Sequence, residues 1–568
     1  MKKSISIIIA LLMALSIGVT AFAADAPSKY SSVDKGWITS VKNQGLTGAC
    51  EAFSTIAVIE ADYISKGYDT KDNTDFSESY LYWFAIYHRI EDEHSPYFGD
   101  GKIYDTSGNI FDLGLEDVDI MSTLKTDMGI AYENDFPFNY NTGVNGEGYD
   151  EVFRYGSGCN VRLDDVVLFE RDNLDAIKQW IMEHGAVTVG YHSNFYFDGT
   201  NGTVAVSNVS LVPNHSVAIV GWDDDFKAQG TGASMAMKGK GAWLCKNSYG
   251  EYWGDNGYFW LPYSAASIDE MMGISVKLDN TCTDRYSYNG FTDYTLPIED
   301  VNKVANFFVA EDSGEVSLVT FYADKDADVT LTVYTDNGDR IPDSGTAVAS
   351  VTKHADTDGV YTETLDNQYS VEKGDGIWLV AEYSNGIPLE NQLKGLTSDR
   401  ENETYVYYND EWIDQGTNNN YGNAPIDIII TGEHRYGETI TVEPTCAQDG
   451  YSITACEKCG KSIRTTTPAT GHDFSDYHIM YSIDNENIPD LYVRECSKCG
   501  EQEFMLVFAD GTTESIPTLD DYLSTYILNV NERVSFFAKI LIFFQNISYF
   551  FSSIGPSIMY NITKLFVF

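Results

Sequence analysis

The sequence predicts an α+β domain first, followed by an all-β sandwich, a small cysteine-bearing segment and a hydrophobic C-terminal helix. Three observations support this order. Apolar residues at helical spacing follow Cys50, and strand-like β-branched runs come after them. From 286 to 432 only short strand-like runs between turn signals remain. Two Cys-x-x-Cys pairs then precede an uncharged stretch at 540–563. A chain of 568 residues is too long for one core, so several domains are expected.

The N-terminus has the features of a secretory signal peptide over residues 1–23. Lys2 and Lys3 precede the apolar run Ile5–Thr20, and Ala21-Phe22-Ala23 supplies an A-x-A cleavage site. An N-terminal membrane helix is the weaker alternative, because the apolar core is short and polar sequence follows at once. We therefore expect a secreted, extracellular or cell-surface-attached protein. The formal net charge of −49 argues against nucleic acid as a partner.

Four residues in the first domain have the chemistry of an acyl-transfer site. Cys50 opens a helical run, where the helix dipole favours a thiolate, and Gln44 stands on the preceding loop as a side-chain N–H donor. His215 begins a β-branched run and Asn247 ends another strand-like run. A nucleophile, a base and an oxyanion donor are the parts that such chemistry needs. The alternative for a lone cysteine is a small buried residue.

The ordered blocks around these residues resemble the papain-like cysteine proteases. The resemblance extends over residues 28–280 and implies a helical lobe and a β-rich lobe with the cleft between them. It also implies roles: Cys50 as nucleophile, His215 as base, Asn247 as its orienting partner and Gln44 as oxyanion donor, with protein or peptide substrates and no cofactor for catalysis. Tyr249 stands where the family usually has a tryptophan that shields the asparagine.

Several alternatives remain open for this domain. Few residues lie between the predicted cleavage site and the glutamine–cysteine block, so no propeptide of the family's usual kind is expected at this end. An endopeptidase is the preferred function, and an exopeptidase is not ruled out by sequence. A surface adhesin, in which the protease fold is an inactive scaffold, is the alternative from another functional class.

The segment 286–432 resembles the lectin-like β-sandwich that follows the protease domain in some secreted bacterial members of the family. Its binding partner would be a glycan or the cell wall, and a purely supporting role is the alternative. The predicted strands are Asn306–Ala310, Val316–Tyr322, Val329–Tyr334, Ala347–Val351, Ile377–Glu382, Glu403–Tyr408 and Ile426–Thr431.

Residues 433–510 form a Cys-x-x-Cys repeat segment with a predicted structural zinc site. Cys446, Cys456, Cys459 and His472 fit a Cys₃His set, and Cys496 and Cys499 repeat the pair. A four-cysteine site made from the two pairs is an alternative arrangement. Disulfides are the competing interpretation, because the expected compartment is oxidising.

The tail at 530–568 is predicted to be an amphipathic, hydrophobic helix. Its apolar residues keep helical spacing and its polar residues gather on the other face. We expect contact with a membrane surface or a partner. A membrane span and a buried core helix are the alternatives.

Overall fold

The computed structural model describes most of the chain between residues 26 and 528. The described ranges are 26–86, 110–125, 129–138, 159–193, 195–198, 202–205, 212–227, 240–268, 271–278, 281–288, 301–389, 401–417, 422–456, 462–483 and 487–528. The predicted signal peptide at 1–23, the predicted tail at 530–568 and Cys459 lie outside these ranges.

The chain divides into two compact units. The first extends to Thr439 and also includes Ile453–Arg464, whereas the second comprises Ile440–Ser452 and the chain from Thr465 onward. The predicted protease-like and sandwich domains therefore belong to one unit, and the Cys-x-x-Cys segment is divided between the two.

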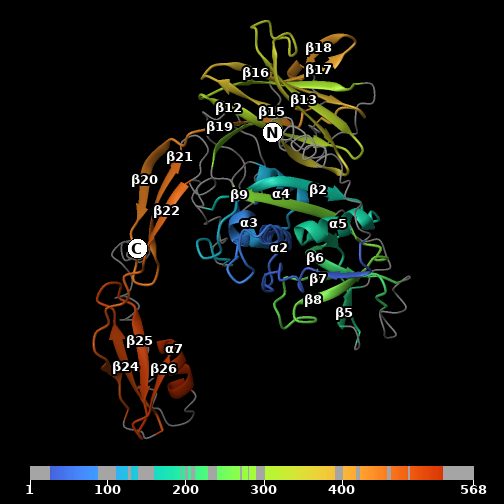
Figure 1. Ribbon diagram of the computed structural model, residues 1–568. Helices are drawn as coiled ribbons and strands as arrows, with labels where there is room; N and C mark the ends of the chain where they lie inside the picture. Colours follow the sequence, from blue (N-terminus) through green and yellow to red (C-terminus); the bar gives the residue numbers. More distant parts are fainter. Residues whose placement is uncertain are drawn as a thin grey trace, which may run out of the picture. The chain divides into compact units, whose positions relative to one another are not determined.

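The helices of the first domain surround one central helix, α2 (Cys50–Ser65). The small residues Ala52, Ala57 and Ala61 are buried on it and allow close packing against β6 and β9 (Figure 1). Its burial is nearly complete, so α2 is a core helix and not an amphipathic surface helix. The other helices are α3 (Glu78–Ile86), the short η1 (Ile110–Asp112), α4 (Asp117–Lys125) and α5 (Leu174–His184).

The strands of the first domain belong to one long sheet. Most neighbours pair antiparallel, in the order β2-β9-β3-β6-β7-β8-β5-β4, and β1 pairs with β6 at the side of this path. The bounds are β1 (Lys29–Ser31), β2 (Val161–Phe169), β3 (Val187–Tyr191), β4 (Phe195–Asp198), β5 (Gly202–Ala205), β6 (His215–Asp223), β7 (Ala242–Lys246), β8 (Tyr258–Pro262) and β9 (Met271–Leu278).

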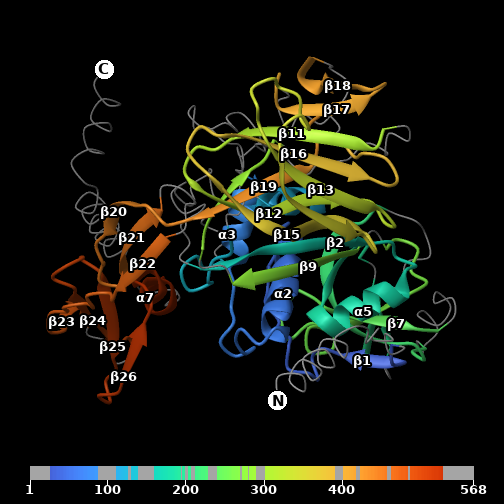
Figure 2. The ribbon, with the colours of Figure 1, turned by 45° about the horizontal axis from the view of Figure 1, so that its top comes forward.

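The second domain is a β-sandwich, as predicted, and Figure 2 shows its two layers. One layer has the order β14-β13-β16-β11-β17-β18, and the other is β10-β19-β12-β15. Apolar side chains from both layers form one core. The bounds are β10 (Cys282–Tyr286), β11 (Lys303–Val309), β12 (Gly314–Ala323), β13 (Asp328–Thr335), β14 (Ala347–His354), β15 (Asp358–Val371), β16 (Gly376–Tyr383), β17 (Thr404–Tyr408), β18 (Glu411–Asp414), η5 (Gln415–Thr417) and β19 (Ile426–Gly432).

The second layer continues directly into the sheet of the first domain. Strand β15 pairs antiparallel with β2, with Gly359 opposite Val167. Lys125 of α4 forms a buried ion pair with Asp427 of β19 at 3.1 Å, and Arg285 lies 3.3 Å from the same carboxylate. The two domains therefore share backbone hydrogen bonds and buried charges, and we call the joined pair the platform. The sandwich begins with β10 at Cys282, ahead of the predicted boundary at 286.

A three-stranded sheet follows, made of β20 (Tyr436–Val442), β21 (Gly450–Cys456) and β22 (Ser462–Thr467). The division between the two units falls within these strands. The second unit has its own four-stranded sheet and a small core that includes Leu491 and Tyr522. Its elements are β23 (His478–Tyr481), β24 (Asp490–Glu495), β25 (Gln502–Val507), β26 (Thr513–Ile516), α7 (Leu519–Tyr522) and the π-helical turn η6 (Leu523–Leu528). Among the described residues no helix is both long and apolar enough to span a membrane.

Candidate active site

The loop before α2 presents Cys50 at the first position of the helix, where the side chain is half-buried. This loop lies directly against the backbone of residues 111–113, where the Gly48 N–H donates to the Phe111 carbonyl at 2.6 Å. Only glycine fits at position 48, because a Cβ there would lie 2.4 Å from the Leu113 carbonyl oxygen. Ala49 is the N-cap and supplies no capping hydrogen bond. The sulfur therefore stands at a helix N-terminus whose N–H groups are not covered by a capping side chain.

His215 is the first residue of β6 and is held by three neighbours. Its Nε2 lies 2.8 Å from Oδ1 of Asn247, which follows β7. Its ring stacks on Tyr249 with a centroid distance of 4.8 Å, and the Tyr191 ring packs against it edge-on with a centroid distance of 5.8 Å. Since Nε2 is engaged with Asn247, Nδ1 is the ring nitrogen left for proton exchange with a thiol. Tyr249 thus takes the shielding place that the sequence suggested.

Burial lowers the pKa of the His215 imidazole, and the hydrogen bond that its Nε2–H donates to Asn247 acts in the opposite direction. Asn247 is itself fixed, because Oδ1 also accepts from the Ser248 backbone N–H at 2.8 Å. Burial thus favours the neutral imidazole, and the contact with Asn247 favours the protonated form.

Two observations bring Cys50 and His215 into one site. Ser54, one turn after Cys50, shares a 2.7 Å hydrogen bond with Ser216, the residue after the histidine. Burial, and after it the charge of Cys50, raises the pKa of Tyr249, whose ring stacks on His215. The first turn of α2 and the start of β6 therefore meet, as the predicted cleft requires.

Gln44 lies buried beside this pair, and its loop is tied to the asparagine strand. Its backbone N–H donates to the Ser248 carbonyl at 2.9 Å, and its Oε1 accepts from Ser248 Oγ at 2.5 Å. Its Nε2 donates to the Thr47 carbonyl at 2.8 Å. An amide nitrogen carries two hydrogens, so one N–H remains for a substrate oxygen. The left-handed conformation of Gly45, with φ of 66°, turns the loop toward Cys50.

A largely buried charge cluster, here called the lysine cluster, lies next to the candidate catalytic residues. It consists of Lys42, Glu60, Asp75, Glu78 and Lys246. Nζ of Lys42 contacts carboxylates of Glu60 at 3.3 Å, Asp75 at 2.8 Å and Glu78 at 2.8 Å. Burial lowers the pKa of Lys246 to about 8 and raises that of Glu78 to about 8. With Asn247 and Ser248, most members line one small cavity.

Sequence reasoning missed this cluster and the serine contacts. A signal existed for Lys246, since a lysine inside the apolar run of β7 requires a buried partner. The acidic partners come from α2 and from residues 75–78, and no local spacing links them to that lysine.

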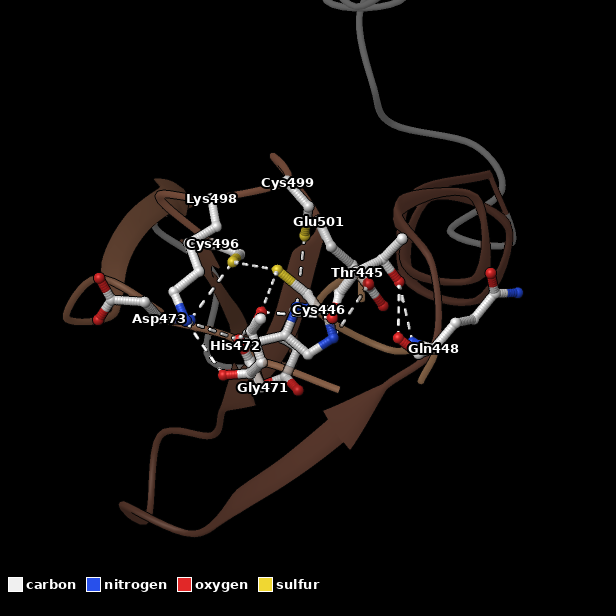
Figure 3. A network of polar contacts seen from close by, with 12 residues as sticks. Thr445, Cys446, Gln448, Gly471, His472, Asp473, Cys496, Lys498, Cys499 and Glu501 are labelled. Atoms are coloured by element: carbon white, nitrogen blue, oxygen red, sulfur yellow. Dashed lines mark hydrogen bonds and ion pairs between the residues drawn. The ribbon is translucent and has the colours of Figure 1, made fainter. Parts of the chain in front are cut away.

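In the second unit four predicted metal ligands come together. Side-chain atoms of Cys446, His472, Cys496 and Cys499 all lie within 4.8 Å of one another (Figure 3). The Cys446 and Cys496 sulfurs are 3.8 Å apart, and Cys499 Sγ lies 3.4 Å from His472 Nδ1. Two sulfurs bound to one tetrahedral zinc at ~2.3 Å would be about 3.8 Å apart. We call these four residues the first cluster.

The predicted grouping of Cys446 with the first Cys-x-x-Cys pair does not match this geometry. Cys456 belongs to the other compact unit, and Cys459 lies outside the described residues. Cys446 instead joins the second pair, Cys496 and Cys499, because β21 carries Cys456 away from it. The alternative four-cysteine site from the two pairs includes Cys459 and so lies partly outside the described residues.

Comparison with known proteins supports both domains. A sequence model of the papain family cysteine proteases matches residues 114–277, which include His215 and Asn247. A model of the lectin-like domain matches residues 283–428.

Curated relatives match the first domain. A protein named "Probable cysteine protease RD19B" from Arabidopsis thaliana is 28% identical over 235 residues, which cover 41% of this chain and 57% of the relative. Cathepsin F of Drosophila melanogaster is 25% identical over 245 residues, which cover 42% of this chain and 34% of the relative. The chain thus spans less than two thirds of the length of either relative.

Solved structures match both domains together. The cysteine protease and lectin-like domains of Cwp84, a surface layer associated protein of Clostridium difficile, give a TM-score of 0.58 at 23% identity, covering 72% of this chain and 90% of that one. The clostridial cysteine protease Cwp84 after propeptide cleavage gives a TM-score of 0.58 at 24% identity, covering 72% and 100%. At these identities the match establishes the fold, and it extends across both domains of the first unit.

Proposed function

Because the chain carries a papain-family cysteine protease domain followed by a lectin-like domain, we propose that it is a cysteine endopeptidase. It would hydrolyse internal peptide bonds of protein substrates through Cys50, His215 and Asn247. The observation that carries the proposal is the 2.8 Å contact between His215 Nε2 and Asn247 Oδ1 in a buried site that also receives the start of α2. The fold alone would not support an activity, whereas this constellation does.

The reaction follows from the positions of these groups. His215 Nδ1 takes the thiol proton, and Cys50 Sγ attacks the peptide carbonyl carbon. The oxyanion accepts hydrogen bonds from the Cys50 backbone N–H and the remaining Gln44 Nε2 hydrogen. His215 then gives its proton to the leaving amine as the C–N bond breaks and a thioester forms. His215 then takes a proton from a water molecule, whose oxygen attacks the thioester carbon. The C–S bond breaks, the carboxylic acid product leaves, and the proton passes from His215 to the Cys50 sulfur.

Internal cleavage is the decisive property of an endopeptidase. We would incubate the purified protein with an unfolded protein substrate whose N-terminus is acetylated and whose C-terminus is amidated, and identify the products by mass spectrometry. Internal fragments that disappear with Cys50→Ala support the endopeptidase. Stepwise release of terminal residues from an unblocked substrate, with the blocked one untouched, would replace it with an exopeptidase. No hydrolysis of either would favour the adhesin.

Gln44→Ala is expected to lower kcat/KM by about 10²–10³-fold, the usual effect of losing one oxyanion donor. Alkylation of Cys50 by iodoacetamide develops no oxyanion, so its rate should stay close to that of the unsubstituted protein. Steady-state kinetics and alkylation rates measure the two effects. A parallel loss of both would indicate that Gln44 only maintains the loop.

Asn247→Ala is expected to move the alkylation profile of Cys50 to higher pH. Its hydrogen bond opposes the lowering of the His215 pKa, so its loss lowers that pKa further. A weaker imidazolium stabilises the thiolate less, and a higher pH is needed to form it. We expect kcat/KM to fall by about 10²-fold, within the range for general base catalysis. An unchanged profile would contradict the orienting role.

The protein is further proposed to be secreted and held at the bacterial surface. The signal-peptide pattern at 1–23 supports secretion, and the printed description of Cwp84 as a surface layer associated protein supports the location by likeness of fold. The lectin-like domain is proposed to bind glycan or cell wall, and the tail at 530–568 to contact the membrane. Binding of the Cys50→Ala protein to purified wall polysaccharide would test the first of these.

The first cluster is proposed to hold a structural zinc ion. Three sulfurs and one imidazole nitrogen suit Zn²⁺, and the backbone N–H of Asp473 donates to Cys496 Sγ at 3.3 Å, as expected beside a thiolate ligand. Cys446→Ser should lose one zinc per chain by elemental analysis. A full zinc content in this variant would contradict the proposal.

A further inference from the structure

A second group of side chains that could bind a metal lies in the first unit. The sequence analysis did not predict that these residues lie together. Cys282 is the first residue of β10, His434 follows β19, and Cys456 ends β21. One side-chain atom from each lies within 4.8 Å of the others. We call these three residues the second cluster. All three belong to the same compact unit, so their proximity does not depend on how the two units are placed.

The second cluster repeats the geometry of the first. The Cys282 and Cys456 sulfurs are 3.8 Å apart, the same separation as between Cys446 and Cys496. This is the edge expected for two thiolates on one tetrahedral zinc, about 3.8 Å for bonds of ~2.3 Å. A disulfide would need the sulfurs at about 2.05 Å.

The contacts around the sulfurs also correspond. The residue after the histidine donates its backbone N–H to the cysteine of the Cys-x-x-Cys pair in both places: Arg435 to Cys456 at 3.3 Å, and Asp473 to Cys496 at 3.3 Å. A Thr-Gly dipeptide stands near each histidine: Thr470-Gly471 directly precedes His472, whereas Glu433 separates Thr431-Gly432 from His434. The two sites thus share the backbone N–H donation to a cysteine sulfur, with one residue more between the glycine and the histidine in the second cluster.

The environment fits a structural ion. Cys282 and Cys456 are each 2% exposed, and His434 is half-buried. Two thiolates and an imidazole are ligands that suit Zn²⁺, and a dication would offset the cost of burying the two thiolate charges. A disulfide would involve the two sulfurs alone and would not explain why a ring nitrogen of His434 lies within 4.8 Å of both.

We propose that Cys282, His434 and Cys456 bind a second zinc ion. Its ligands come from the first strand of the lectin-like domain, from the residues after its last strand, and from β21 of the following segment. Arg464, in the same unit, adds an ion pair with Asp135 of the protease domain at 2.9 Å. The ion therefore fastens the segment Ile453–Arg464 to the platform formed by the protease and lectin-like domains.

Metal counting on the full chain tests this proposal independently of proteolysis. The protein is purified with Zn²⁺, dialysed, and analysed by elemental mass spectrometry. We expect two zinc ions per chain, one in Cys282→Ser and one in His434→Ala. Cys446→Ser should also retain one, and Cys282→Ser combined with Cys446→Ser should retain none. His354→Ala, an exposed histidine of the same β domain paired with Asp328, is the matched control and should retain two.

Cobalt substitution keeps the test valid if a variant folds poorly. Co²⁺ added to the unsubstituted, zinc-depleted protein should give thiolate-to-cobalt charge-transfer absorption for two equivalents, and Cys446→Ser should still give it for one. Unchanged zinc in both Cys282→Ser and His434→Ala would overturn the proposal. So would a peptide that contains a Cys282–Cys456 disulfide, found by mass spectrometry after alkylation without reduction.

Discussion

Cys50→Ala and His215→Ala are each expected to reduce kcat/KM by about 10⁴–10⁶-fold, as losses of a nucleophile or its base do in acyl-transfer enzymes. Cys50 supplies the only group in the described site that can form the thioester, and His215 is buried with its Nε2 already committed to Asn247. Because the two act as one unit, the double variant should be no less active than either single one. Initial rates of cleavage of an unfolded protein substrate measure all three.

A matched control comes from the same domain. His192 follows β3, the strand that pairs with β6, and its ring contacts the Val212 carbonyl at 3.1 Å in an exposed position. His192→Ala should keep its activity within a few-fold of the unsubstituted protein. A His215→Ala protein that folds normally and retains more than a hundredth of the activity would remove His215 from the mechanism.

Lys42→Met is expected to lower the free energy of unfolding by about 3–5 kcal/mol, the usual cost of breaking a buried ion pair by removing one partner. The lysine lies within 3.3 Å of Glu60 and 2.8 Å of Glu78, and both carboxylates are almost fully buried. Burial already raises the pKa of Glu78 to about 8, and the charge of Lys42 is the main opposing influence. Without it, the variant keeps buried carboxyl groups with too little compensation. Urea unfolding followed by fluorescence would measure the change.

Two further variants separate this effect from general disturbance. Lys71→Met removes a surface lysine that pairs with exposed Asp72 and should change the stability by less than about 1 kcal/mol. Adding Glu78→Gln to Lys42→Met should recover part of the loss, because the folded state then no longer has to protonate a buried carboxyl group or leave it charged and unpaired. No recovery, together with a small effect of Lys42→Met alone, would show that the lysine cluster contributes little.

Local patterns in the sequence were sufficient to single out the candidate site residues and many of the strands. Cys50, His215 and Asn247 each stand at an element boundary with its own local signature, and the structure places His215 beside Asn247 and the first turn of α2 beside the start of β6. The predicted strand Val316–Tyr322 corresponds to β12. In contrast, β15 was missed, because its long polar stretch lacks the alternation of a half-buried strand.

The remaining features depend on contacts between distant residues. Cys456 was grouped with Cys446 because they are neighbours in sequence, but pairing of β10 with β19 brings Cys282 to it instead. The pairing of β15 with β2 was also not predicted, because the local sequence of a strand does not specify which distant strand it pairs with. Sheet topology decides both, and the sequence pattern carries no direct signal of it.

Labelling with an epoxysuccinyl inhibitor directed at cysteine proteases tests the central claim most directly. The purified protein is treated with the inhibitor, and mass spectrometry identifies and quantifies the modified cysteine in the unsubstituted, His215→Ala and His192→Ala proteins. We expect stoichiometric modification of Cys50 that is lost with His215→Ala and kept with His192→Ala. A Cys50 that reacts no faster than an ordinary free thiol, with no dependence on His215, would contradict the assignment of this site as a cysteine protease.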